Sequence, residues 1–109
     1  MDEKIAAGMF KALSDQTRIQ MVRYLDSCGK EGAAAGDISE HVGAASSRAS
    51  FHLAALEKAG MVSVERQSRK MIYRANLNDL GGLISFLLDD CCGRNPDILS
   101  CCSISGTCD

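Results

Sequence analysis

Apolar residues recur at helical spacing over the first quarter of the chain, and this pattern predicts two consecutive helices. Asp2 has the position and the side chain of an N-terminal cap, and the first helix is expected to end near Leu13. Its apolar stripe consists of Ile5, Met9, Phe10, Ala12 and Leu13. A break at Ser14 and Asp15 precedes the second helix, which is predicted from Thr17 to Asp26. The stripe of this second helix consists of Ile19, Val22 and Leu25, with Met21 beside it.

The next segment predicts a short helix, a tight turn and a longer helix, which is the order of a helix-turn-helix. Residues 29–36 are rich in glycine and alanine and indicate a loop or a loose helix start, while 37–41 have the length of one short helix. Ser46 or Ser47 is expected to cap the longer helix, which ends at Gly60. Its predicted anchoring residues are Phe51, Leu53, Ala54 and Leu56. Its predicted outward-facing residues are Ser47, Arg48, Ser50 and His52.

A hairpin and an amphipathic helix complete the pattern. Residues 61–64 and 71–73 favour strands, and the polar segment 65–70 between them predicts a hairpin with a basic tip. Asn78 or Asp79 can cap a final helix. Its apolar residues recur at i, i+3, i+4, i+7 and i+8, namely Leu80, Leu83, Ile84, Leu87 and Leu88. Because a small winged domain closes its core without a further helix, this face is expected to pair with a second copy of the chain.

Together these elements predict a mostly α-helical fold with a β-hairpin wing, that is, a winged helix-turn-helix. At 109 residues with 46% hydrophobic composition, the chain is expected to bury one ordinary core without disulfides. The predicted DNA-binding and dimerisation domain spans residues 1–92, and residues 93–109 are expected to form a flexible Cys-rich C-terminal tail.

The distribution of charge adds a candidate surface for DNA. The formal net charge of −2 by itself argues weakly against nucleic-acid binding. Residues 44–75, however, carry six basic residues and two acidic ones, and the segments on either side are acidic. Only the surface that faces a duplex has to be positive, so this distribution is typical of a local phosphate-binding surface. Charge alone leaves an ordinary solvated face as the alternative.

Five of the six cysteines lie in the last 19 residues, as the pairs Cys91-Cys92 and Cys101-Cys102 and the single Cys108. A secreted disulfide framework spreads its cysteines through the chain, and no apolar signal segment opens this one. The expected compartment is therefore a reducing cytoplasm, where clustered cysteines indicate metal binding or redox chemistry. No apolar run approaches the ~20 residues of a membrane helix, so no membrane partner is expected.

Two motifs give the chain a resemblance to a known family. The first is Leu13-Ser14-Asp15-Gln16-Thr17-Arg18, and the second is Ser47-Arg48-Ala49-Ser50-Phe51-His52-Leu53, followed by Leu56 and Ala59-Gly60. Over roughly residues 5–92 the chain resembles the ArsR/SmtB family of metal-responsive repressors. One departure is Ser68, which stands where such wings often have glycine.

This resemblance implies a homodimer, held by the N- and C-terminal helices, that binds double-stranded operator DNA. It also implies two sets of DNA-binding residues, Ser47, Arg48, Ser50 and His52 on the recognition helix and Arg66, Arg69 and Lys70 on the wing. Basic residues at the wing tip can neutralise phosphates, and a helix of about 12 residues fits a major groove.

The inducer sites of this family can be compared with the chain one by one. A Cys-Val-Cys site would fall near residues 33–37, which contain no cysteine, and a zinc site on the last helix needs histidines that are absent from Asn76 onward. The stretch from Leu87 to Cys92 resembles instead the arsenic-responsive subgroup, in which a cysteine pair and a downstream cysteine form a three-sulfur site.

The expected function is a transcriptional repressor that leaves its operator when As(III) or Sb(III) binds the tail thiolates. The candidate ligands are Cys91, Cys92, Cys101 and Cys102. Three thiolates suit a trigonal ion, whereas the four together could form a zinc site. A thiol redox or persulfide sensor on the same scaffold is the alternative, because the two pairs could form a disulfide. An enzyme is not expected, since the chain has no Cys-x-x-Cys motif and no phosphate-cradling loop.

Overall fold

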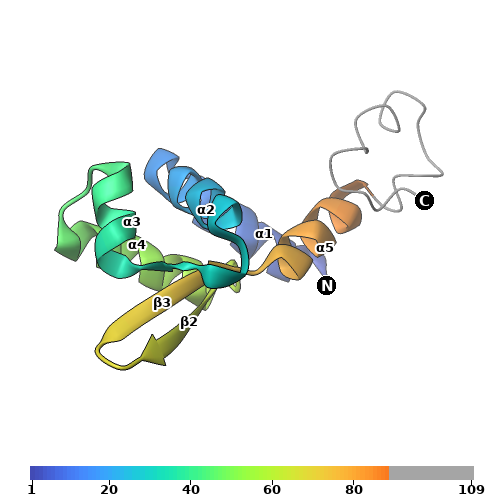
Figure 1. Cartoon of the computed structure of the whole chain (residues 1–109). Coiled ribbons are helices and arrows are strands. Elements are labelled where there is room, and N and C mark those ends of the chain that lie inside the picture. The colour runs from blue at the N-terminus through green and yellow to red at the C-terminus, as the bar shows by residue number, and fades with distance from the viewer. Residues whose placement is uncertain (89–109) are drawn as a thin grey trace.

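The computed structural model of the chain describes residues 1–88, and the structural statements below refer to these residues. The elements follow in the order α1 (Glu3–Leu13), α2 (Gln16–Cys28), a 3-10 turn (Gly29–Glu31), β1 (Ala33–Ala34), α3 (Ala35–Val42), α4 (Ser46–Lys58), β2 (Val62–Gln67), β3 (Lys70–Ala75) and α5 (Leu77–Leu88). The three strands form one antiparallel sheet in the order β1-β3-β2. The predicted mostly helical fold with a β-hairpin wing is confirmed (Figure 1).

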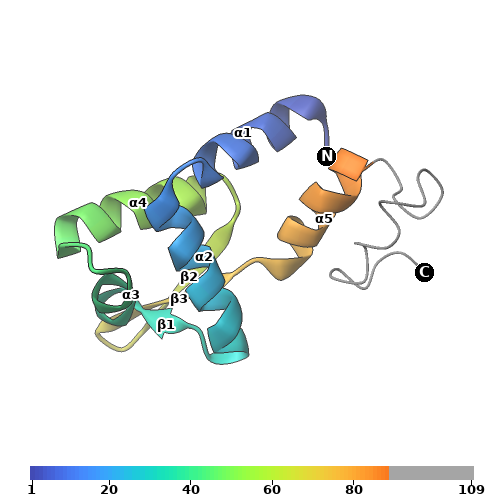
Figure 2. The ribbon, with the colours of Figure 1, turned by 90° about the horizontal axis from the view of Figure 1, so that it is seen from above.

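The arrangement of these elements separates a helical pair at one end from the wing at the other. The views from the side and from above both place α5 at the end of the molecule opposite α3 and the tip of the β2–β3 wing (Figures 1 and 2). At the α5 end, α1 packs against α5, and it also contacts α2 and α4. The helix α1 therefore connects α5 to the helix-turn-helix.

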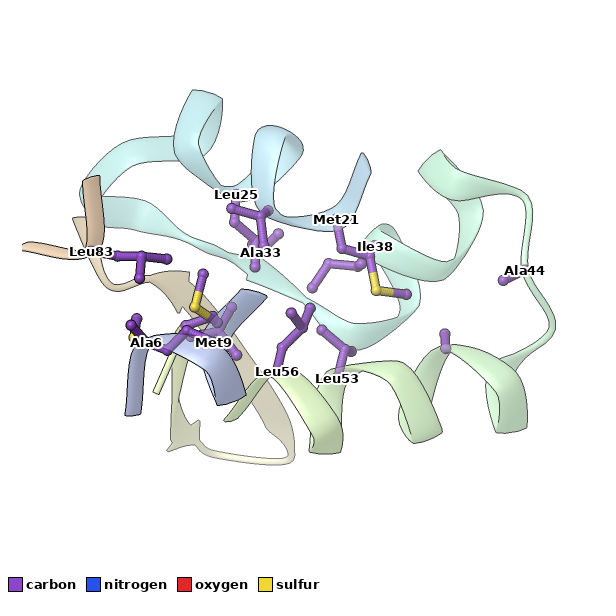
Figure 3. Packing of buried hydrophobic residues seen from close by; sticks show 14 residues of the cluster. Ala6, Met9, Met21, Leu25, Ala33, Ile38, Ala44, Leu53, Leu56 and Leu83 are labelled. Atoms are coloured by element: carbon purple, nitrogen blue, oxygen red, sulfur yellow. The ribbon is translucent and has the colours of Figure 1, made fainter. Parts of the chain in front are cut away.

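The core lies between α2, α3 and α4 and continues toward α1 and α5. Leu53 and Leu56 of α4 point toward Met21 of α2 and Ile38 of α3, and all four are fully buried (Figure 3). At the other end of the core, Leu83 is the one residue of α5 that is buried, with 2% of its surface exposed. The core thus includes residues of all five helices.

Several predicted helix boundaries are confirmed by the backbone. The Asp2 carboxylate accepts a hydrogen bond of 2.8 Å from the Ile5 N–H, so it caps α1 as predicted. At the end of α4, the N–H groups of Gly60 and Met61 donate to the carbonyls of Glu57 and Leu56. This pattern is a Schellman motif, and it needs the positive φ of 80° that Gly60 adopts.

Other boundaries differ from the prediction. Ala45, with no side-chain cap, precedes α4, so Ser46 and Ser47 lie inside its first turn and do not cap it. The helix α5 begins at Leu77, before Asn78 and Asp79, because the Asn76 carbonyl already accepts from the Leu80 N–H. Residues 29–36, expected as a loop or a helix start, contain the 3-10 turn, β1 and the first two residues of α3.

The predicted apolar stripes are partly wrong. Met9, Ala12, Val22 and Leu25 are buried as predicted, but Ile5, Phe10 and Ile19 remain between 40% and 53% exposed. Ala6 and Met21 are buried in their place. Helical spacing allows residues at either edge of the stripe to face the core, and the neighbouring helices decide which of them do. Among the described residues, no helix is long and apolar enough to cross a membrane.

Candidate nucleic-acid interface

The turn between α3 and α4 is held by local hydrogen bonds that fix how α4 leaves the body. Gly43 adopts a left-handed φ of 69°, and its N–H donates to the Glu40 carbonyl. The Ser39 hydroxyl donates to the carbonyl of Ala44, whose side chain is buried. A turn fastened from both sides holds α4 at a set angle to α3, as a recognition helix requires.

The face of α4 that turns away from the core carries three of the four DNA-binding residues predicted on this helix. Ser47, Arg48 and Ser50 are exposed, as predicted from the sequence. The Arg48 guanidinium donates from Nη2 to the Thr17 Oγ1 at 3.3 Å, so part of its donor set is turned toward α2. The remaining donors of Arg48 are available to a phosphate or a base edge.

The prediction that His52 faces outward is wrong. Only 6% of its surface is exposed, and its Nδ1 accepts a hydrogen bond of 2.9 Å from Nε of Arg18. Ala49, Leu53 and Leu56 complete the buried stripe, which has the i, i+3, i+4, i+7 spacing of a core-facing helix.

Phe51 and Ala54, predicted as anchors of α4, are instead exposed. The Phe51 side chain is 65% exposed, the highest value among the large hydrophobic residues that the structure describes. The sequence did contain a signal for this arrangement, because the spacing of Ala49, His52, Leu53 and Leu56 excludes Phe51 from the same face. His52 was predicted to face outward because it is polar, and Phe51 was therefore predicted to anchor the helix.

Arg18 and Asp15, which we did not single out from the sequence, support α4 from the start of α2. Arg18 also donates from Nη1 to the Ala12 carbonyl at 3.3 Å, so it connects α1, α2 and α4. Asp15 caps α2 by accepting from the N–H groups of Thr17 and Arg18. Desolvation raises the pKa of Asp15, but these donors and the nearby His52 and Arg18 outweigh it and hold the pKa below its ordinary value.

The wing presents its basic residues at an exposed tip. Ser68 adopts a positive φ of 57° in the two-residue turn between β2 and β3, the conformation that glycine often supplies in such wings. Arg66, Arg69 and Lys70 are exposed, and Nε of Arg66 donates to the Ser68 carbonyl at 3.3 Å. Three cations within five residues at the tip of a hairpin suit contact with phosphates.

A fourth basic residue of the wing has a structural role. Arg74 donates to the Glu65 carboxylate at 2.8 Å and to the Lys30 carbonyl at 2.7 Å. Hydrogen bonds from the Gln67 amide and from Arg74 lower the pKa of Glu65. Arg74 therefore fastens the wing to the turn after α2, and it is not a DNA candidate.

The predicted thiolate ligands Cys91, Cys92, Cys101 and Cys102 lie outside the described residues. Within residues 1–88, no group of three or more His, Cys, Asp and Glu side chains is arranged to hold a metal ion. Cys28, the cysteine in this part, is half-buried beside Tyr24. Burial, and then the neighbouring Cys28, raise the pKa of Tyr24.

Comparison with known proteins agrees with this architecture. The model of the bacterial regulatory protein arsR family matches residues 15–64, from the cap of α2 into β2. The chain is 37% identical over 68 residues to the HTH-type transcriptional regulator YceK of Bacillus subtilis, covering 62% of this chain and 67% of the relative. A probable mercury resistance operon repressor of Streptomyces lividans is 30% identical over 89% of this chain and 74% of its own length. The chain belongs to the ArsR family.

Solved structures extend the ArsR family assignment to the whole described fold. A homodimeric winged helix-turn-helix DNA-binding domain from Mycobacterium bovis, a possible ArsR-family regulator, has a TM-score of 0.65 at 27% identity, covering 80% of this chain and 81% of that one. An ArsR-like transcriptional regulator from Rhodococcus has a TM-score of 0.71 at 24% identity, over 93% and 92% of the two chains. The chain is thus a DNA-binding transcriptional regulator of the ArsR family and not an enzyme.

Proposed function

We propose that this ArsR-family regulator is a homodimeric repressor that leaves its operator when As(III) or Sb(III) binds thiolates of its C-terminal cysteines. The observation that carries the proposal is the donor set, five cysteines within residues 91–108 of a chain whose first 88 residues contain one. Thiolates are the ligands that soft ions select. The resemblance of the Streptomyces lividans relative, named for mercury resistance, supports a soft, thiophilic inducer.

In this proposal, DNA is bound by the exposed residues of α4 and by the wing tip. Ser47, Arg48 and Ser50 approach base edges and phosphates in the major groove, and Arg66, Arg69 and Lys70 contact the flanking backbone. His52, being buried, acts on DNA through the position of α4 and makes no direct contact. Changing Arg69 to alanine is then expected to weaken binding to all sequences and to flatten the slope of log K against log salt by about one unit.

The proposed dimer uses the outer faces of α1 and α5. Six large apolar residues on these helices are exposed in the single chain, namely Ile5, Phe10, Leu77, Ile84, Phe86 and Leu87. A groove of about 490 Å³ between the two helices is bordered by Phe10, Phe86 and Leu87. Exposed apolar residues gathered on two adjacent helices are typical of a surface that a partner covers. Leu83, expected from the sequence to be part of this seam, belongs to the intramolecular core.

The proposed coupling runs from the cysteines to DNA through α5 and α1. Cys91 and Cys92 follow the last described residue of α5 by three and four positions. Binding of an ion there, with Cys101 or Cys102 as third ligand, changes how α5 packs on α1 and thereby the spacing of the two recognition helices in the dimer. A typical coupling of about 1–3 kcal/mol lowers operator affinity roughly 5- to 150-fold. We propose the division into a domain of residues 1–92 and a tail of residues 93–109 on the same grounds.

Release of a fluorescent operator duplex, followed under reducing conditions, tests the proposal. Arsenite or antimonite is expected to release the parent protein, whereas a Cys91→Ser/Cys92→Ser variant stays bound. Cys28→Ser is the matched control, because it removes a thiol outside the proposed site and should keep the response. Since thiols ionise on ligation, the apparent affinity for arsenite should rise as pH approaches the thiol pKa of about 8.5. Normal release from the double variant contradicts the proposal, and release by mercury(II) alone contradicts the choice of metalloid.

A thiol redox or persulfide sensor on the same scaffold is the second candidate. The arrangement that favours it is the spacing of Cys91-Cys92 and Cys101-Cys102, two pairs separated by eight residues that a disulfide could join. Peroxide or a polysulfide should then release the operator, and a dithiol reductant should restore binding. Release by peroxide without any response to arsenite favours this candidate over the first.

A further inference from the structure

Phe51 is a large apolar side chain on the solvent-facing surface of the recognition helix. The other described side chains that are large, apolar and more than half exposed lie on α1, on α5 or at the N-terminus. The exposed neighbours of Phe51 on the outer face of α4 are the polar residues Ser47, Arg48 and Ser50 and the small Ala54. A single exposed ring among polar and small residues is not a protein-docking patch. The exposed ring therefore indicates a partner other than a protein surface.

The ring is held in place by residues of α2 and α4. The guanidinium carbon of Arg18 lies 5.7 Å from the centroid of the Phe51 ring, within the range of a cation–π contact. His52 meets the same ring edge-on, with centroids 5.6 Å apart and planes at 64°. Arg18 is itself fixed by its hydrogen bonds to the His52 ring and the Ala12 carbonyl. A ring supported in this way loses little freedom on binding, which favours a specific contact.

The chemistry of the ring limits what it can recognise in DNA. Phenylalanine has no hydrogen-bond donor or acceptor, so it does not read the polar edge of a base. The major groove contains one apolar group, the C5-methyl of thymine, and phenylalanine is among the side chains that contact it. Phe51 lies one residue from Ser50 and three from Arg48, both proposed to enter the groove.

We propose that Phe51 is a specificity-determining residue that contacts a thymine methyl in each half-site, and that Arg18 and His52 are positioning residues for its ring. This inference rests on the proposed DNA-binding face of α4, and it adds a thymine in each half-site to what that face recognises. The sequence preference of the protein then includes at least one thymine per half-site whose methyl, rather than its hydrogen-bonding groups, determines affinity.

The test uses duplexes that the parent protein selects from a randomised 30-base-pair pool. Each thymine of a selected duplex is replaced in turn by deoxyuridine, which removes only the methyl group, and affinity is measured by fluorescence anisotropy. Burial of one methyl group predicts about a 4-fold loss for the parent at one position in each half-site. Phe51→Ala should bind the thymine and deoxyuridine duplexes equally, and Phe51→Leu, still apolar, should keep part of the difference.

Two further variants separate positioning from general stability. Arg18→Met keeps the aliphatic stem and removes the guanidinium, so it should bring the thymine-to-deoxyuridine ratio toward one while the helical circular dichroism stays unchanged. Ile19→Ala removes a neighbouring exposed apolar side chain of α2, 45% exposed, and should leave the ratio as in the parent.

The outcomes distinguish this inference from the function on which it rests. A parent protein that binds selected duplexes but is indifferent to every deoxyuridine substitution overturns the role of Phe51 and leaves DNA binding intact. An unchanged ratio in Phe51→Ala has the same consequence. Failure of the parent to enrich or bind any duplex overturns both the DNA-binding face and the inference.

Discussion

Leu83 and Leu87 lie one helical turn apart on α5, and the structure gives them opposite environments. Leu83 is 2% exposed and belongs to the core cluster with Ala6 and Met9 of α1, whereas Leu87 is 61% exposed in the single chain. Changing each to alanine on the same helix gives a matched pair, because the intrinsic helix propensity changes equally in both variants. The proposed dimer predicts different consequences for the two changes.

The expected magnitudes follow from burial. Leu83→Ala leaves a cavity between α5 and α1 and should lower the free energy of unfolding by about 2–5 kcal/mol. Leu87 has roughly 60% of its surface left to bury, so covering it in a dimer contributes about 1–2 kcal/mol per protomer. Both protomers lose this contribution in Leu87→Ala, so the dimer dissociation constant should rise about 30- to 1,000-fold.

Sedimentation over a range of concentrations, together with urea unfolding, measures both effects. Stability lost in Leu83→Ala should persist at protein concentrations well below the dimer dissociation constant, because it arises within one chain. At these low concentrations Leu87→Ala should be as stable as the parent, since the interface is already dissociated in both. An unchanged dimer in Leu87→Ala refutes the proposed interface, and an undiminished stability in Leu83→Ala refutes its place in the core.

Three further predictions concern the supports of the helix-turn-helix and the wing. Gly32→Ala should lower the free energy of unfolding in urea by at least about 2 kcal/mol, because the added Cβ, at a φ of +66°, would overlap the carbonyl oxygen of Tyr73 in β3. Gly36→Ala, whose Cβ meets no atom within 4 Å, should be neutral. His52→Leu removes the acceptor of Arg18 Nε and should lower the free energy of unfolding by about 1–3 kcal/mol, while His52→Asn, whose amide oxygen can take the place of Nδ1, should lose less. The pKa of Asp15 is depressed in the folded chain, so the stability that this residue contributes is complete above its ordinary pKa of 3.8 and is lost as pH falls through the lower folded value. The free energy of unfolding of Asp15→Ala should therefore fall less steeply with acid over that interval than that of the parent. Equal slopes for the two proteins contradict the role of the cap.

The sequence by itself determined the features that depend on neighbouring residues. The cap of α1 at Asp2 and the end of α4 at Gly60 are set by side-chain and backbone preferences within one turn, and both were predicted correctly. The order of helices and the basic hairpin, and with them the exposed cations of the wing, follow from local periodicity and turn composition. The motifs around Thr17 and Ser50 were sufficient to indicate the family.

Helical spacing is compatible with more than one buried face on these helices, and the tertiary structure decided between them. His52 is inside because a guanidinium 34 residues earlier in the chain supplies its hydrogen bond, and a polar residue is placed in a core only where such a partner exists. The same packing leaves Phe51 outside, so the residue we propose as a reader of thymine was predicted as core. On α5, one apolar stripe is divided between the contact with α1 at Leu83 and an exposed face at Leu87, a division that depends on where α1 lies and that helical spacing leaves open.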